Sequence, residues 1–191
     1  MGRLRRAALL VLVNLGVLVL LLVLVEGGAS LLLFLRDAGR TQALAERLHT
    51  VHDPELGWVN EPGVHQPDMY GPGVGLTINA QGFRSTEPTP TRTAGGAIRL
   101  VCSGDSFTLG YGVADDATWC HQLAEIDPRL ETVNMGQGGY GFDQAWLWYR
   151  RDGAPLEHRI HVFAFITDDF RRMERDRFLG YAKPLLGVDG D

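Results

Sequence analysis

The sequence predicts an α/β fold in three layers, with a parallel sheet, preceded by one N-terminal transmembrane helix. Two observations support this prediction. Residues 7–25 are almost entirely apolar, and between residues 98 and 166 short β-rich runs alternate with segments of helical character. Alternation of strands and helices is typical of a parallel sheet that is covered by helices on both faces.

The apolar segment 7–25 is long enough, as a helix, to cross a hydrocarbon core about 30 Å thick. The arginines of residues 1–6 precede it and Glu26 follows it. The positive-inside rule therefore predicts a single-pass membrane protein whose N-terminus is cytoplasmic and whose soluble domain is periplasmic or extracellular. A cleaved signal peptide is the alternative, because small residues follow at 27–30. The further apolar stretch 31–35 favours an uncleaved anchor.

Residues 26–96 connect the apolar segment to the predicted folded domain, and we call them the lead-in. Helix-forming residues at 41–48 indicate a short juxtamembrane helix. From residue 52 onward, Pro and Gly turns separate brief extended pieces such as 76–79. The Thr, Pro and Gly of 86–96 are typical of a linker, which predicts a boundary near Gly96 and a folded domain over 97–191.

Within 97–191 the expected elements follow in alternating order. We predict strands at 98–102, 132–134 and 160–166, and helices at 118–125 and 142–151. In such a sheet the functional loops lie beyond the carboxyl ends of the strands. The site should therefore be sought just after each strand.

Composition excludes some classes of partner and cofactor. The formal net charge is -5, from 18 Lys and Arg against 23 Asp and Glu, so we expect no nucleic-acid partner. The two cysteines, Cys102 and Cys120, fit neither a metal-ligand spacing nor a disulfide framework. We interpret them as small buried residues, and we expect no metal ion and no cofactor.

A serine follows the first predicted strand, in the run Gly104-Asp105-Ser106. This position lies at the carboxyl edge of the sheet, where a nucleophile would be useful, and the glycine permits a tight turn. The alternative is that Ser106 only caps the next helix, because Ser and Asp are common N-cap residues.

Two sequence blocks resemble those of the SGNH (GDSL) hydrolases, which are serine esterases. The run 104–108, with Gly110 and 112–113, resembles the block that carries the nucleophile, and 133–141 resembles the loop whose glycine amide binds the oxyanion. The resemblance implies a flavodoxin-like three-layer fold, Ser106 as nucleophile and Gly139 as oxyanion amide, with Gly136 as the second choice. A turn is the plainer interpretation of the glycine-rich loop. The lead-in of membrane-anchored bacterial members is similar at 53–58 and 79–84, where we expect Trp58 and Phe83 to hold the lead-in on the domain.

The third block departs from the family pattern. The family has Gly-x-Asn-Asp, whereas this chain has Asp168 at the position of the asparagine, followed by Asp169. An ionised carboxylate accepts hydrogen bonds and repels an oxyanion, so a role for Asp168 requires its protonation. A solvated or capping carboxylate is the alternative interpretation.

The catalytic His and Asp that the family places in Asp-x-x-His do not occur after Asp169. We therefore expect a chain truncated at its C-terminus and an incomplete domain. Three histidines lie near the predicted elements, namely His121, His158 and His161, and each is interpreted as structural or exposed.

The sequence therefore predicts an ester hydrolase or acyl transferase that acts through Ser106. Its expected substrates are acyl or acetyl esters of the cell envelope, glycans among them. The alternatives are a non-catalytic module of the same fold that binds a glycan or an assembly partner, and an inactive fragment whose sheet lacks its remaining strands.

Overall fold

The structure is a computed structural model that describes residues 2–38, 48–93, 95–178 and 180–187. The chain divides into two compact units, Met1–Ala43 and Leu44–Asp191. Each unit is described by itself below.

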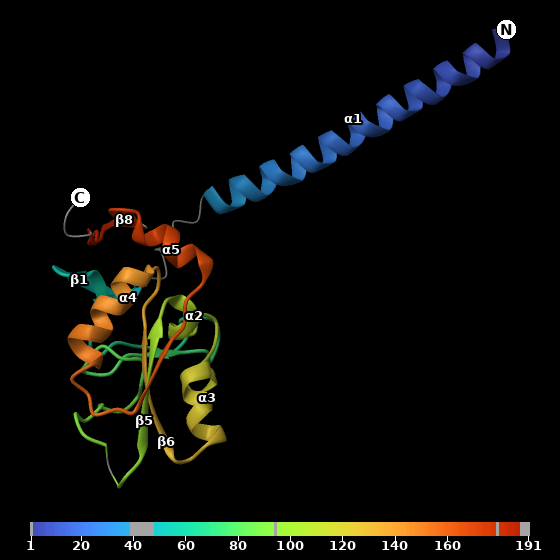
Figure 1. Cartoon of the computed structure of the whole chain (residues 1–191). Helices are drawn as coiled ribbons and strands as arrows, with labels where there is room; N and C mark the ends of the chain where they lie inside the picture. Colours follow the sequence, from blue (N-terminus) through green and yellow to red (C-terminus); the bar gives the residue numbers. More distant parts are fainter. Residues whose placement is uncertain (1, 39–47, 94, 179, 188–191) are drawn as a thin grey trace. The chain divides into compact units, whose positions relative to one another are not determined.

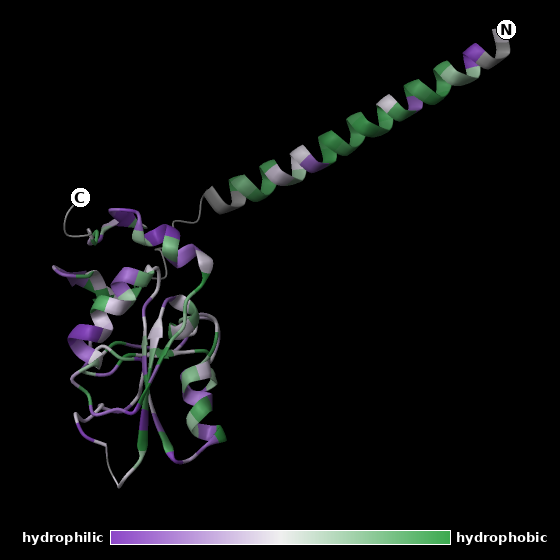
Figure 2. Cartoon of the chain, viewed as in Figure 1, coloured by the Kyte–Doolittle hydropathy of each residue, from purple (hydrophilic) through white to green (hydrophobic). Residues whose placement is uncertain are grey.

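The first unit is one long helix, α1 (Gly2–Ala38). The segment Arg5–Leu35 contains an 18-residue window with a mean hydropathy of 3.2 and is long and apolar enough to span a membrane. Figure 2 shows this apolar character along almost the whole helix. The helix continues past residue 25, the expected end of the span, because Gly27 and Gly28 remain helical and the chain turns apolar again after them.

The second unit is built on a three-stranded parallel sheet in the order β6-β5-β7. Its central strand is β5 (Ile98–Gly104), flanked by β6 (Leu130–Gly136) and β7 (Ile160–Phe163). All three strands overlap the runs predicted from sequence. The parallel register places the carboxyl ends of β5 and β6 side by side, with Gly104 opposite Gly136.

Helices cover both faces of this sheet, as predicted. Figure 1 shows α3 (Trp119–Ile126) on one face and α4 (Phe142–Trp148) on the other. On the α3 side the core contains Leu100, Cys102 and Cys120, and on the α4 side it contains Val101, Val133, Met135, Ala145 and Trp148. A π-helical turn, η3 (Tyr149–Gly153), continues α4. The sheet and its two helical layers therefore form a three-layer α/β arrangement.

The lead-in packs onto the domain in two places: Leu56, Trp58 and Phe83 join the core on the α4 side of the sheet, whereas Leu76 and Ile78 pack against Leu109, which follows β5. It contains the hairpin of β1 (Thr50–Asp53) and β2 (Gly57–Asn60) and the pair of β3 (His65–Gln66) and β4 (Leu76–Thr77). Trp58 is 1% exposed and Phe83 is 2% exposed, in the same core as Trp148, which confirms that they hold the lead-in on the domain. The compact unit thus includes both the lead-in and the segment after Gly96. The helix expected at 41–48 falls almost wholly outside the described residues.

The remaining short elements lie around the sheet. They are α2 (Ser106–Leu109), the 3-10 turn η2 (Asp115–Ala117), α5 (Thr167–Met173), and the hairpin of β8 (Arg177–Phe178) and β9 (Tyr181–Ala182). Figure 1 draws α2, α5 and β8 toward one end of the sheet, the end where β5 and β6 stop. This is the carboxyl edge of the sheet, where the sequence predicts the functional loops.

The interpretation of the cysteines as two unlinked core residues is wrong. Cys102 and Cys120 are each fully buried, as expected, but they form a disulfide that joins β5 to α3. The two residues meet because Thr118 caps α3 and the first turn of the helix brings Cys120 into the same small core as Cys102 of β5. A spacing of 18 residues carries no signal for this pairing, since it depends on how the helix crosses the sheet.

Candidate active site

Ser106 is the first residue of α2, just beyond the carboxyl end of β5. The preceding residue, Asp105, caps this short helix: its carboxylate accepts a hydrogen bond from the Phe107 backbone N–H at 2.9 Å. Asp105 therefore acts as the cap, and Ser106 does not. Ser106 is partly exposed, whereas Asp105 is buried. The Ser106 side chain therefore lies at this edge without a capping role.

The two glycines proposed for the oxyanion differ in their surroundings. Gly136 ends β6, and its backbone N–H donates to the side chain of Asn134 at 2.9 Å. A Cβ on Gly136 would lie 1.9 Å from the backbone nitrogen of Leu109, so Gly136 is the residue that lets α2 pack directly on β6. Its amide is already used, which removes Gly136 as the second choice for an oxyanion donor.

Gly139 lies in the loop after β6 with a φ of 78°, in the left-handed region that favours glycine. Within the part of the chain that the structure describes, neither its backbone N–H nor that of Ser106 donates a hydrogen bond. Among the described residues, two backbone N–H groups without a hydrogen-bond acceptor therefore lie in the loops that follow the adjacent strands β5 and β6.

The lead-in holds this loop in place from the side of β2. Trp58 donates from Nε1 to the Gly138 carbonyl at 2.9 Å, and Asn60 donates from Nδ2 to the Gly136 carbonyl at 3.1 Å. The Tyr140 hydroxyl in turn donates to the Trp58 carbonyl at 2.5 Å. Three buried side chains thus fix the loop backbone, so the lead-in is part of the framework of the site.

The third block forms the start of α5 and is organised by an arginine. Arg172 donates from Nε to Asp168 at 3.0 Å and from Nη1 to Asp169 at 3.0 Å. Asp168 is about half exposed and ion-paired. It therefore offers no donor to an oxyanion, in contrast to the asparagine that the family pattern has at this position.

Asp169 is the buried member of the acidic pair. Its carboxylate accepts the Ile166 backbone N–H at 3.0 Å and so caps α5. Burial raises the pKa of the Asp169 carboxyl to about 6, against the lowering effect of that hydrogen bond; Asp105 also raises it, and Arg172 lowers it. The carboxyl edge of the sheet thus contains one carboxyl that titrates near neutral pH.

No histidine within the described ranges contacts Ser106. His161 of β7 lies with Nε2 2.5 Å from the Oγ of Ser103, a serine that is fully buried inside the sheet, and it stacks on Tyr149. Burial lowers the pKa of the His161 imidazole, and His158 lowers it further. His121 lies on exposed α3 beside Glu125. These positions agree with the interpretation of the three histidines as structural or exposed.

A cavity of about 570 Å³ opens beside β6, between the β3–β4 pair and the start of α3. Charged and polar side chains, among them Arg84, Glu87, Asp115, His65 and His121, contribute to its lining, although apolar atoms make up most of the lining surface. Neither Ser106 nor Gly139 nor Asp168 contributes to it.

Sequence reasoning missed Arg172 and Asn60. Arg172 lies four residues after Asp168 and three after Asp169, a spacing that favours ion pairs on one helix face. That spacing was a usable signal. The long-range contacts of Asn60 to Gly136 and Gly82 carry no comparable local pattern.

The chain was compared with known proteins. No family model matches it, and no curated protein matches it. The resemblance to SGNH hydrolases therefore depends on the sequence motifs around Ser106 and Gly139 alone.

Proposed function

We propose that this protein is an SGNH-type ester hydrolase or acyl transferase in which Ser106 is the nucleophile. One observation carries the proposal: the unpaired backbone N–H groups of Ser106 and Gly139 follow the ends of two adjacent parallel strands, with a partly exposed serine hydroxyl between the strand and its helix. Backbone donors in this arrangement suit an oxyanion that forms on an acyl group attacked by Ser106.

In the proposed reaction the Ser106 Oγ forms a bond to the acyl carbon of an ester, and the Ser106 proton passes to a base. The carbonyl oxygen becomes an oxyanion that accepts hydrogen bonds from the Ser106 and Gly139 amides. The bond to the alcohol then breaks, and the alcohol leaves with a proton. Water completes hydrolysis of the acyl-serine, or a hydroxyl group of a second substrate accepts the acyl group.

The proton acceptor is not among the described residues that contact Ser106. A positioned general base contributes about 10²- to 10⁴-fold to such a step. Acylation of this chain should therefore be slow at neutral pH and should accelerate with hydroxide concentration. Asp168 stands where the family has an asparagine that donates to the oxyanion. The loss of one such donor should lower the rate further, by about 10²-fold or more.

We also propose that α1 anchors the chain with its N-terminus in the cytoplasm and the second unit on the opposite side. The arginines at 3, 5 and 6 favour this orientation. The disulfide of Cys102 and Cys120 supports it independently, because disulfides persist in oxidising compartments and are rare in the cytosol. Acyl or acetyl esters of envelope glycans are the substrates that this location makes accessible.

The test is hydrolysis of p-nitrophenyl acetate by the full chain in detergent, between pH 7 and pH 9. Ser106→Ala should abolish the protein-dependent rate, whereas Ser103→Ala should leave it unchanged, since Ser103 is buried in the sheet. A rate that is equal in wild type and Ser106→Ala would refute the proposal.

A second candidate is a non-catalytic envelope module that binds a glycan or an assembly partner. The cavity beside β6 favours it, because a volume of about 570 Å³ is in the usual range for ligand sites, several charged and polar side chains line it, and it excludes Ser106. Calorimetry with an oligosaccharide of N-acetylglucosamine tests this candidate. Binding that survives Ser106→Ala but fails after Glu87→Gln and Asp116→Asn, in a protein without esterase activity, would support the module.

A further inference from the structure

Arg172 of α5 contacts all three loops at the carboxyl edge of the sheet. Its Nη1 donates to the Asp105 carboxylate at 3.2 Å and to the Tyr140 carbonyl at 3.1 Å, in addition to Asp169. The Arg172 side chain is 12% exposed and Asp105 is 3% exposed. One buried guanidinium therefore connects the residue before Ser106, the residue after Gly139 and the start of α5.

Phe178 completes this arrangement. Its ring lies 5.0 Å from the Cζ of Arg172, within the range of a cation–π contact. The same ring covers Gly139, because a Cβ on that glycine would lie 2.8 Å from Phe178. Arg172 and Phe178 therefore contact the Gly139 loop together, beside Trp58, which also lies near Gly139.

The charges explain why an arginine is needed at this point. Asp105, Asp168 and Asp169 all lie within hydrogen-bond distance of Arg172. Without the guanidinium, Asp105 and Asp169 would be buried negative charges without a cationic partner, which is strongly unfavourable. The planar fork of an arginine can bind several oxygens at once, whereas a lysine offers a single point charge.

We propose that Arg172 is a positioning residue of the Ser106 site. It fixes Asp105, and through the capped turn of α2 it fixes Ser106, at a constant distance from the Gly139 amide. This inference rests on the proposed function, because it assigns Arg172 a role in acyl transfer as well as in folding. A displacement of about 1 Å at a reacting group can cost about 10² in rate.

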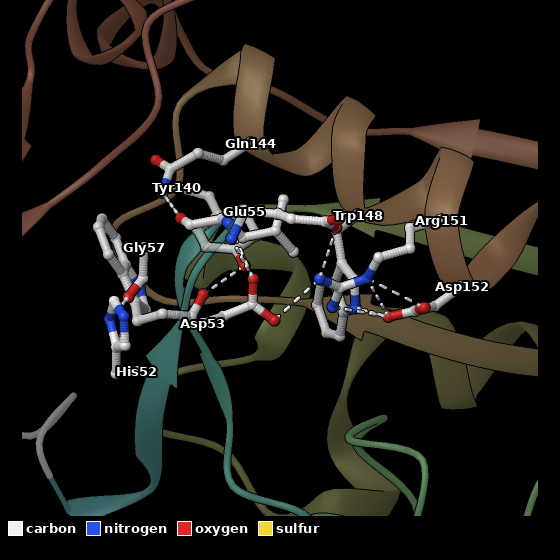
Figure 3. A network of polar contacts seen from close by, with 11 residues as sticks. His52, Asp53, Glu55, Gly57, Tyr140, Gln144, Trp148, Arg151 and Asp152 are labelled. Atoms are coloured by element: carbon white, nitrogen blue, oxygen red, sulfur yellow. Dashed lines mark hydrogen bonds and ion pairs between the residues drawn. The ribbon is translucent and has the colours of Figure 1, made fainter.

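The test compares Arg172→Gln and Arg172→Lys with a matched control, Arg151→Gln. Arg151 is also an arginine bound to several carboxylates, those of Asp53, Glu55 and Asp152, and it joins the lead-in to the end of α4 (Figure 3). The Arg151 network does not include Ser106, Asp105 or Gly139, but it extends to Tyr140, which follows Gly139 (Figure 3). Loss of Arg151 should therefore lower stability and should affect acylation less than loss of Arg172 does.

Three quantities are measured on the full chain in detergent: the rate of Ser106 acetylation by p-nitrophenyl acetate, the melting temperature, and amide hydrogen exchange of 105–110 and 136–141. Arg172→Gln should slow acetylation about 10- to 100-fold and accelerate exchange in both segments. Arg172→Lys should recover part of the rate, because it restores a positive charge but not the planar guanidinium that binds several oxygens. Arg151→Gln should lower the melting temperature, slow acetylation less than Arg172→Gln does, and leave exchange of 105–110 as in wild type.

The possible failures are distinguishable. If wild type is acetylated at Ser106 and Arg172→Gln reacts at the same rate with unchanged exchange, the inference fails and the proposed function stands. If Arg172→Gln does not fold, Arg172→Lys decides by the same readouts. If wild type is not acetylated at Ser106, the proposed function fails, and the positioning role falls with it.

Discussion

Three glycines allow the local account of the site to be tested at single positions. Gly112 has a φ of 79° in open space, Gly139 has a φ of 78° beneath Phe178, and Gly136 lies against the backbone of Leu109. Alanine at Gly112 should cost about 1 to 2 kcal/mol of unfolding free energy, from the left-handed backbone alone. Alanine at Gly139 should cost about 1 to 3 kcal/mol more of unfolding free energy, because its Cβ would overpack against Phe178. Gly136→Ala should lower the unfolding free energy most of the three.

Urea unfolding of the three variants in detergent measures this order. Gly112→Ala is the matched control for Gly139→Ala, because the two glycines have the same backbone conformation and differ in their neighbours. Equal losses at Gly112 and Gly139 would contradict the close packing of Phe178 on the loop.

Asp169 gives the site a pH dependence whose sign can be worked out. Burial raises the pKa of its carboxyl to about 6 from the ordinary value of 3.8, so the folded state holds this proton more tightly than the unfolded state. The contribution of Asp169 to stability should therefore fall as the pH rises from about 4 through 6, and remain low above that. The expected size is on the order of 1 to 3 kcal/mol.

Asp169→Asn removes this titration while it keeps an oxygen acceptor for the Ile166 N–H. The unfolding free energy is measured at pH 4.5 and pH 7.5 for wild type and variant, and the pH change of the variant is subtracted from that of wild type. A difference of the opposite sign, with wild type gaining stability toward pH 7.5, would show that Arg172 dominates and lowers the pKa of Asp169.

At the scale of residues, the sequence predicted the positions of candidate site residues where a chemical role requires one residue type near the end of a strand. Ser106 and Gly139 follow such patterns, and both lie at the expected edge. The ion pair of Asp168 could have been predicted, because Arg172 follows four residues later on the same helix. The loss of Gly136 as a donor could not be predicted, because it depends on a hydrogen bond to Asn134.

At the scale of elements, the disulfide fastens α3 to the centre of the sheet. It closes a loop between residues 18 positions apart, for which chain entropy gives about 3 kcal/mol of stabilisation. The double variant Cys102→Ala/Cys120→Ala should therefore lose about 2 to 5 kcal/mol of unfolding free energy. Denaturant unfolding of the oxidised wild type and the double variant measures it. If alkylation of the unreduced wild type detects two free thiols, the pairing of Cys102 with Cys120 is contradicted.

The strands and helices between residues 98 and 163 could be predicted because hydrophobic pattern and turn residues agree there. The lead-in could be predicted only as irregular extended chain. Its strands β1 to β4 have two to four residues each, too short for a periodic signal. Their positions depend on long-range contacts such as those of Trp58 with the Gly138 carbonyl.

At the scale of the whole molecule, the account predicts the side of the membrane on which the second unit folds. In cells that express the full chain, Cys102 and Cys120 should resist alkylation until a reductant is added. Reversal of the flanking charges, by Arg3→Glu, Arg5→Glu and Arg6→Glu together with Glu26→Lys, should turn the topology around and leave both thiols reactive after denaturation. Thiols that are free in the wild-type protein would place the second unit in the cytoplasm.

The central claim is that Ser106 becomes acylated, and one measurement tests it most directly. The full chain is incubated with p-nitrophenyl acetate at pH 8.5, digested, and analysed by peptide mass spectrometry, with Ser106→Ala and Arg151→Gln treated in parallel. The account predicts one acetyl group on the peptide of β5 and α2, located on Ser106, in wild type and in Arg151→Gln. An unmodified Ser106, or the same acetylation of that peptide in Ser106→Ala, would contradict it.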